Sequence, residues 1–155
     1  MSETNKSVVF QVGNEEYAIQ IQYVISIEKM ESITPIPHLP EYVKGIVEVR
    51  GELIPVIDFE SILYNRPLLV NENARLIVLK TDEISLAVLV NEAKEIIDIP
   101  EEKLKQVGLI TYSKTSYFVG VANLDHRLIT VINPSSLLKS LEGIEEIKDY
   151  MASYV

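Results

Sequence analysis

The fold is decided by the stretch Gly45-Ile46-Val47-Glu48-Val49-Arg50-Gly51-Glu52-Leu53-Ile54-Pro55-Val56-Ile57-Asp58. Two apolar runs of β type flank the pair Arg50-Gly51. This pair predicts a tight turn between two strands, because Gly adopts backbone conformations that other residues avoid. An arginine at such a tip is either solvated or in contact with a partner. The stretch therefore predicts a β-hairpin whose tip has a functional role or serves solubility alone.

The same stretch has a second copy further along the chain. Residues 45–63 align without a gap with residues 120–138, so that Gly45 matches Gly120 and Asp58 matches Asn133. A weaker similarity links residues 17–21 with 86–90. The chain is therefore expected to form one domain, residues 1–155, built from two related halves at about 8–63 and 75–138. The second copy has Asp125-His126 where the first has Arg50-Gly51, and a turn that differs within a shared scaffold is a candidate functional site.

Composition restricts the classes of function. The 155 residues and 47% apolar content are typical of a globular protein with a real core. The net charge of −9 disfavours binding to nucleic acid or to an anionic membrane surface. The chain has no cysteine, no apolar run near the ~20 residues of a membrane-spanning helix, and no signal-peptide core at its start. We therefore expect a cytoplasmic protein without disulfides or membrane insertion.

Short strands separated by frequent turn signals favour a mainly β fold of two small closed β-barrels. Residues 23–28 fit either a strand or a short helix, and the prolines in 34–41 predict an irregular connection. The strands are expected at about 8–12, 17–21, 45–50, 52–57, 75–80, 84–90, 95–99, twice within 111–124, and at 128–132. The sequence leaves open whether each barrel uses contiguous residues or exchanges strands with the other.

Two helix starts are expected. Asp58 is a candidate N-cap for a helical turn at 59–63, and Asn133-Pro134 repeats this arrangement. From there an apolar residue recurs every three or four positions, which predicts an amphipathic C-terminal helix over 135–154. Gly143 should kink this helix or cause early fraying.

The chain offers little for catalysis. The only histidines, His38 and His126, fall in a Pro-rich loop and at a hairpin tip, where surface positions are expected. The sequence has no His-x-x-x-His, Gly-x-Gly-x-x-Gly, P-loop or Gly-x-Ser-x-Gly motif, and its carboxylates cluster in turns and on a helix flank. We therefore expect no enzymatic activity, no cofactor and no metal site.

A binding role fits the residues better. The strands 84–90 and 53–57 are apolar at nearly every position, whereas a strand with one solvated face alternates. Either both faces of these strands are covered by the two barrels, or one face awaits a partner. The two explanations are compatible if a groove runs between the barrels.

Residues 45–58 closely resemble the signature of the CheW family of bacterial chemotaxis coupling proteins. Members commonly have Gly-(Val/Ile)-x-Asn-Leu-Arg-Gly, then an apolar run with Pro-(Val/Ile), then Asp. The resemblance covers nearly the whole chain, since residues 10–17, 36–45, 86–93 and 120–138 follow in the family's order. With no kinase or receiver segment, the chain is similar to stand-alone CheW and not to CheA or CheV.

The resemblance implies two five-stranded β-barrels around a groove and a non-enzymatic adaptor, monomeric when alone. It implies two partners: the cytoplasmic hairpin tip of chemoreceptors, and the CheW-like regulatory domain of the histidine kinase CheA. Recruitment to receptor arrays at the inner face of the membrane follows from these partners. The residues expected to bind partners are Gly45, Val49, Arg50, Gly51, Ile54, Val88 and Val90.

The sequence departs from the family pattern at two positions. Glu48 replaces the usual Asn, and Ser26 stands where many members have a Glu that pairs with the signature arginine. Glu28 or Glu48 is then the candidate partner of Arg50. Two alternative functions stay open: a CheW-like scaffold of another chemosensory array, for example one for surface motility, and, more remotely, a β-barrel that binds a small ligand.

Overall fold

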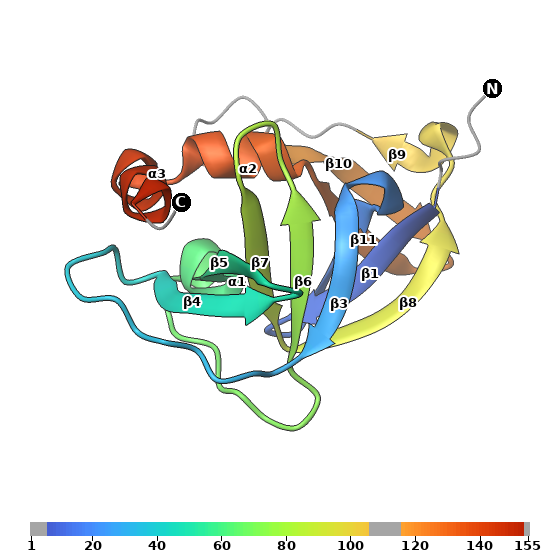
Figure 1. The fold of residues 1–155 in the computed structure, drawn as a ribbon. Coiled ribbons are helices and arrows are strands. Elements are labelled where there is room, and N and C mark those ends of the chain that lie inside the picture. The colour runs from blue at the N-terminus through green and yellow to red at the C-terminus, as the bar shows by residue number, and fades with distance from the viewer. Residues whose placement is uncertain (1–5, 106–115, 154–155) are drawn as a thin grey trace.

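A computed structural model describes residues 6–105 and 116–153 of the protein. Its elements are mostly short strands, and two α-helices lie near the C-terminus (Figure 1). In chain order they are β1 (Lys6–Val12), β2 (Glu15–Gln20), the 3-10 turn η1 (Ile21–Tyr23), β3 (Val24–Lys29), β4 (Val43–Val49), β5 (Glu52–Asp58), α1 (Phe59–Tyr64), β6 (Arg75–Lys80), β7 (Ser85–Val90), β8 (Glu92–Asp98), the 3-10 turn η2 (Glu101–Lys103), β9 (Leu104–Lys105), β10 (Phe118–Leu124), β11 (Arg127–Ile132), α2 (Pro134–Ser140) and α3 (Ile144–Ala152).

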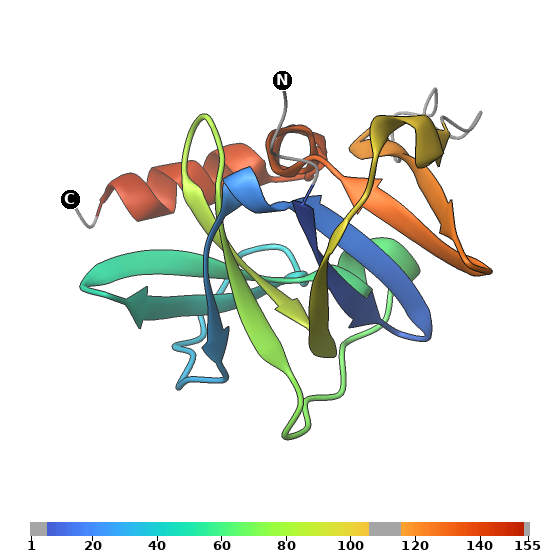
Figure 2. The ribbon, with the colours of Figure 1, turned by 90° about the vertical axis from the view of Figure 1, so that its right-hand side faces the viewer.

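The strands form two sheets, and each sheet takes strands from both halves of the chain. One sheet, called sheet A here, has the order β8-β1-β2-β11-β10-β9, and the other, sheet B, has the order β3-β6-β7-β5-β4. The hairpin β1–β2 therefore lies among strands of the second half, and the hairpin β6–β7 lies among strands of the first half (Figures 1 and 2). The halves exchange hairpins, so neither sheet is made of contiguous sequence.

The two sheets also match in detail. Each contains one parallel pair, β11 with β2 and β5 with β7. Each edge pair β3–β6 and β8–β1 has one register shift, and the hairpins β4–β5 and β10–β11 each have one, next to Gly45 and Gly120 respectively. We propose that the two halves derive from one repeated unit, and these matched irregularities support that proposal.

The mainly β class is confirmed, but the sheets are not closed five-stranded barrels. Sheet A has a sixth strand, the two-residue β9, and the described pairings leave both sheets open. In sheet B a single bridge between Thr34 and Ile46 brings the chain after β3 to β4, and Pro35 then ends the ladder because it has no N–H to donate. In sheet A, Pro100 and η2 interrupt the path from β8 to β9.

Three apolar clusters hold the sheets together. The largest lies between them and includes Phe10 of β1, Phe59 of α1 and Val88 of β7. A second cluster lines the inner face of sheet B and includes Val56 and Leu89, while a third lines the inner face of sheet A. Strands β5 and β7 thus contribute to two clusters, which is why their sequences are apolar on nearly every residue. Of the two explanations offered for these strands, burial on both faces is the one observed.

The C-terminal segment forms two helices where one was expected. Helix α2 ends at Ser140, where the backbone of the next residue, Leu141, is extended, and α3 begins at Ile144, directly after Gly143, whose backbone is left-handed with φ of 79°. Both N-cap predictions are confirmed, because Ser61 N donates to Asp58 Oδ1 and Ser136 N donates to Asn133 Oδ1. Ile144 and Ile147 are buried, so α3 packs on the central cluster. Within the described ranges, no helix has both the length and the apolar character needed to cross a bilayer.

Candidate functional site

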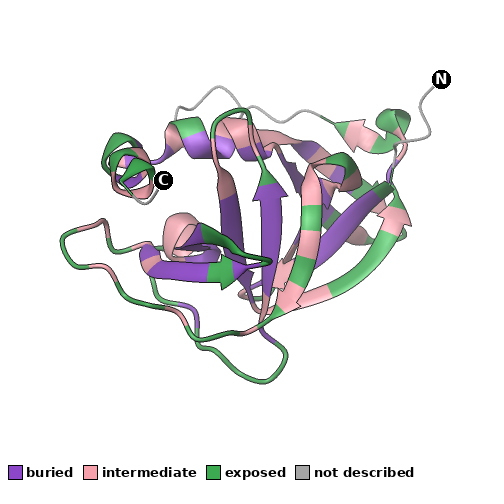
Figure 3. Cartoon of the chain, viewed as in Figure 1, coloured by how far each residue is buried: buried purple, intermediate pink, exposed green. Residues whose placement is uncertain are grey.

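The β4–β5 turn presents Arg50 to solvent. Arg50 and Gly51 have φ of 53° and 83°, which makes this a tight hairpin turn with both central residues left-handed. The Arg50 side chain is 72% exposed. Figure 3 shows exposed residues at this end of an otherwise buried β4. The turn is therefore a rigid support for an accessible guanidinium.

Glu28 of β3 is the partner of Arg50. Arg50 Nη2 lies 3.9 Å from Glu28 Oε2, and the Glu28 side chain is 22% exposed. Of the two carboxylates that the sequence left open, the structure selects Glu28, while Glu48 is exposed. A single contact of this length on a mostly solvated arginine contributes little stability, about 0.5 kcal/mol or less. Arg50 thus keeps most of its hydrogen-bonding capacity.

Gly45 has a structural role instead of a contact surface. It is buried, and its φ is 143°. A Cβ at this position would lie 2.0 Å from the carbonyl oxygen of Thr34. The glycine is needed for the close approach of Thr34 to β4, where Thr34 and Ile46 exchange two backbone hydrogen bonds of 2.9 Å.

Four of the residues expected to bind partners are buried in the core. The exposed fractions are 7% for Val49, 2% for Ile54, 1% for Val88 and 0% for Val90. Their side chains fill the cluster inside sheet B or the cluster between the sheets. A partner cannot contact these four residues without displacing packed side chains. Of the seven residues expected to bind partners, only Arg50 and Gly51 are exposed.

The exposed apolar residues of the sheets lie elsewhere. Ile25 and Ile27 on β3 are 46% and 41% exposed, and Ile96 on β8 is 53% exposed. Strands β3 and β8 are edge strands of their sheets. They are also equivalent, because Ile27 pairs with Ile77 of β6 and Ile96 pairs with Val8 of β1, beside the matched register shifts. Figures 1 and 2 show both strands on the outside of the fold.

We call Ile25, Ile27 and Ile96 the edge isoleucines. They are not among the residues expected to bind partners: residues 23–28 fit either a strand or a helix, and Ile96 lies in an expected strand, 95–99, whose exposed face the sequence does not indicate. Large aliphatic side chains on an exposed strand edge are a liability unless a partner covers them. The alternation of exposure along β3 identifies Ile25 and Ile27, and the exposed stretch of β8 identifies Ile96.

The turns of the equivalent hairpins β4–β5 and β10–β11, called the hairpin ends below, are each followed by an exposed leucine. Leu53 follows the Arg50-Gly51 turn and is 37% exposed, and the equivalent Leu128 follows the Asp125-His126 turn and is 62% exposed. Asp125 and His126 also have left-handed backbones, with φ of 49° and 69°. The two ends of the fold thus share one geometry but differ in charge.

Arg127 joins several side chains at the equivalent end of sheet A, and no local sequence pattern marks it as a functional residue. Its Nε and Nη2 donate to the two oxygens of Glu16 on β2 at 3.0 and 3.1 Å, and Nη2 lies 2.7 Å from Glu95 on β8. Lys94 Nζ lies 3.7 Å from Glu16 Oε2. Three strands from both halves are joined here. The hydrogen bonds from Arg127 hold the pKa of Glu16 below its ordinary value.

We predict that Arg127→Ala lowers the unfolding free energy by about 1 kcal/mol at neutral pH, because the network is partly exposed. The pKa of Glu16 is lowered on folding, so its stabilisation is present above the ordinary value of 4.5 and is lost as pH falls through the folded pKa. Urea denaturation of both proteins at neutral pH and near pH 3 measures this. An equal difference at both pH values would contradict the assignment.

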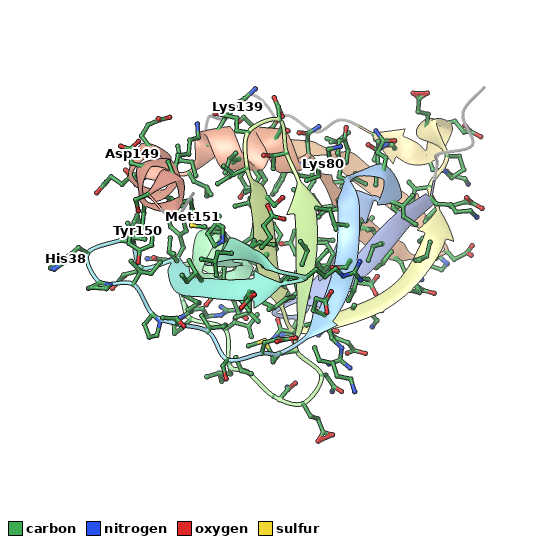
Figure 4. The ribbon with its side chains drawn as sticks, viewed as in Figure 1. His38, Lys80, Lys139, Asp149, Tyr150 and Met151 are labelled. Atoms are coloured by element: carbon green, nitrogen blue, oxygen red, sulfur yellow. The ribbon has the colours of Figure 1, made fainter. Side chains whose placement is uncertain are left out.

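The described residues contain no cluster of three or more histidine, aspartate or glutamate side chains suited to a metal ion. Both histidines are exposed, as expected, and Figure 4 shows His38 at the tip of the loop before β4, directed away from the fold.

A cavity of about 1120 Å³ lies between α1 and α2 and is lined in part by Tyr42, Asn65 and Lys139. This cavity lies outside the two sheets. The interior of each sheet is filled by apolar side chains, so the described part of the chain leaves no room inside for the small ligand that a ligand-binding β-barrel would hold.

Comparison with known proteins identifies a family. A family model described as the CheW-like domain matches residues 6–142. The chemotaxis protein CheW of Bacillus subtilis is 28% identical over 145 residues, with 93% of each chain covered. That of Klebsiella aerogenes is 26% identical over 136 residues, covering 87% of this chain and 82% of the relative. The crystal structure of the scaffolding protein TtCheW from Thermoanaerobacter tengcongensis superposes with a TM-score of 0.80 at 28% identity, covering 92% of each chain.

Proposed function

The chain belongs to the CheW-like domain family, and we propose from this that it is a chemotaxis adaptor that couples chemoreceptors to the histidine kinase CheA. The family match over residues 6–142 is the observation that carries the proposal. As an adaptor it has no catalytic activity and needs no cofactor. It acts in the cytoplasm, at receptor arrays on the inner face of the membrane, by holding two partners together.

The edge isoleucines are our candidate surface for the receptor. Their side chains are about half exposed and lie on edge strands of both sheets. An amphipathic helical hairpin buries its apolar face when it docks on such a surface. Arg50 supplies a charge close to the end of β3, through its contact with Glu28. The receptor tip is therefore expected to contact β3 and β8 and to reach the β4–β5 turn.

The hairpin ends are our candidate surface for the kinase. The partner expected there, the regulatory domain of CheA, has the same kind of fold as this chain. Two folds of one kind can pair through equivalent ends, and Leu53 and Leu128 supply an apolar residue at each end. The two surfaces meet only at the β4–β5 turn, whereas the edge isoleucines serve the receptor alone and Leu128 serves the kinase alone, so the adaptor can hold both partners side by side. The alternative of a CheW-like scaffold in another array, such as one for surface motility, stays a prediction.

We predict that Arg50→Ala separates binding from folding. The side chain is 72% exposed and has one described ion pair, so its removal should change the unfolding free energy by less than about 0.5 kcal/mol. Loss of an arginine that contacts a partner weakens binding by about tenfold or more. Thermal unfolding and isothermal titration with a receptor hairpin-tip fragment and with the CheA regulatory domain measure the two effects.

The competing role for Arg50 is structural, through Glu28. In that case the unfolding midpoint falls first, and affinity falls for both partners as a consequence. Glu48→Ala is the matched control, because Glu48 is an exposed residue of the same hairpin and has no described ion pair with Arg50. An Arg50→Ala protein with unchanged stability and unchanged affinity for both fragments would exclude a partner contact by Arg50.

A further inference from the structure

The Arg127 network at one end of sheet A has no counterpart at the equivalent end of sheet B. In sheet A, Glu95 of β8 accepts an ion-pair contact of 2.7 Å from Arg127. The equivalent position on β3 is Ser26, because Ser26 pairs with Val78 of β6 and Glu95 pairs with Val9 of β1, each beside the register shift. The position equivalent to Arg127 is Glu52. The end of sheet B therefore lacks the cation and the carboxylate that complete the network in sheet A.

Ser26 is left without a hydrogen-bond partner. Its Oγ atom is buried and is the only such unpartnered side-chain atom in the described part of the chain. A buried hydroxyl without a partner costs about 1–3 kcal/mol, so a site that keeps one calls for an explanation. Ser26 and Glu28 lie two residues apart on the same face of β3, as the alternating exposure of this strand shows. A rotation of the Glu28 side chain along that face brings its carboxylate toward the hydroxyl.

The Arg50–Glu28 pair is suited to exchange. Arg50 makes one contact of 3.9 Å, whereas Arg127 makes a two-point contact with Glu16 and a further contact with Glu95. Guanidinium groups bind carboxylates best through two parallel N–H donors. The Arg50 guanidinium therefore has donors available for a carboxylate that arrives from solvent, and the weak contact with Glu28 is the one it must give up.

We propose that Ser26, Glu28 and Arg50 form a receptor for one carboxylate side chain of the partner that docks on β3. The incoming carboxylate takes the two-point contact with Arg50. Glu28 then turns away and accepts a hydrogen bond from Ser26 Oγ, which satisfies the hydroxyl that is unpartnered in the free protein. The exposed Ile25 and Ile27 lie on the opposite face of β3 from Ser26 and Glu28, and β3 is an edge strand, so one partner that packs along this edge reaches both the isoleucines and the carboxylate site. This inference deepens the proposed function and rests on it.

The test uses the full chain and a receptor hairpin-tip fragment in isothermal titration. Glu28→Gln removes the competing charge from Arg50, so affinity should rise about two- to fivefold, the range of an exposed ion pair. In the double variant Glu28→Gln with Arg50→Ala this gain should disappear. Ser26→Ala removes the hydroxyl that receives Glu28, so affinity should fall about two- to fivefold. The thermal midpoint of the free Ser26→Ala protein should stay level or rise, because a buried unpartnered group has been removed.

The outcomes separate this inference from the proposed function. If the wild-type protein binds neither the receptor fragment nor the CheA regulatory domain, the proposed function fails. If the wild-type protein binds the receptor fragment but Glu28→Gln and Ser26→Ala leave the affinity unchanged, the carboxylate site is wrong and the adaptor role stands. A fall in both affinity and midpoint for Ser26→Ala would mean that the hydroxyl is structural, and would also overturn the carboxylate site. Lys103→Ala, an exposed change on η2 outside β3, β8 and the β4–β5 turn, is the matched control.

Discussion

Gly45→Ala is expected to lower the unfolding free energy by more than about 4 kcal/mol, enough to unfold much of the protein. The added Cβ would lie 2.0 Å from the oxygen and 2.7 Å from the carbonyl carbon of Thr34. Both are backbone atoms, held by the two hydrogen bonds between Thr34 and Ile46, so they cannot turn aside. The positive φ of 143° adds strain for any side chain. Urea denaturation followed by circular dichroism measures the change.

Gly51→Ala is the matched control for this prediction. Gly51 also has a positive φ, of 83°, but nothing lies within 4 Å of an added Cβ. Its substitution should therefore cost only the backbone strain, about 1 kcal/mol. If the two substitutions cost the same, the close approach at Thr34 is not what requires Gly45.

Asp58→Ala is expected to cost about 3 kcal/mol or more, because one fully buried carboxylate has several partners. Asp58 Oδ1 accepts from Ser61 N at 3.2 Å, and Oδ2 accepts from Leu68 N at 2.9 Å. Lys44 Nζ lies 3.5 Å from Oδ2. The substitution removes all three contacts: the cap of α1, the hydrogen bond to the loop before β6 and the ion pair with the partly buried Lys44. Thermal or urea unfolding measures this loss.

Asn133→Ala at the equivalent position of the second half is the comparison. Asn133 caps α2 through Ser136 N at 2.9 Å, and this is its described side-chain hydrogen bond. Loss of a cap alone costs about 1 kcal/mol. Equal costs for Asp58→Ala and Asn133→Ala would mean that the contacts with Leu68 and Lys44 add nothing.

Much of the fold could be predicted from local sequence. The Arg50-Gly51 turn, the strands on either side of it and both N-caps depend on neighbouring residues, and the structure has them all. The exchange of hairpins between the halves could not be predicted. It depends on pairs such as Ile132 with Ile19, far apart in the chain, and an apolar strand fits either sheet equally well.

The candidate site was harder to predict than the fold. The apolar strand 84–90 makes Val88 and Val90 candidate contact residues, but apolar character alone does not distinguish burial in a core from exposure to a partner. Arg127 and Glu16 are separated by 111 positions, so no local pattern joins them. The choice of Glu28 over Glu48 depends on which edge strand lies beside the β4–β5 turn, and that is a property of the folded sheet.

The measurement that tests the adaptor role most directly is the retention of CheA on an immobilised receptor hairpin-tip fragment, with and without this protein. If the protein is an adaptor, the kinase is retained in proportion to the wild-type protein added. Ile27→Lys should lower retention by about tenfold, because a charge then replaces an apolar contact. Binding of the Ile27→Lys protein to the kinase alone should stay unchanged. Retention of the kinase that does not depend on this protein, or binding of this protein to only one of the two partners, would exclude the adaptor role.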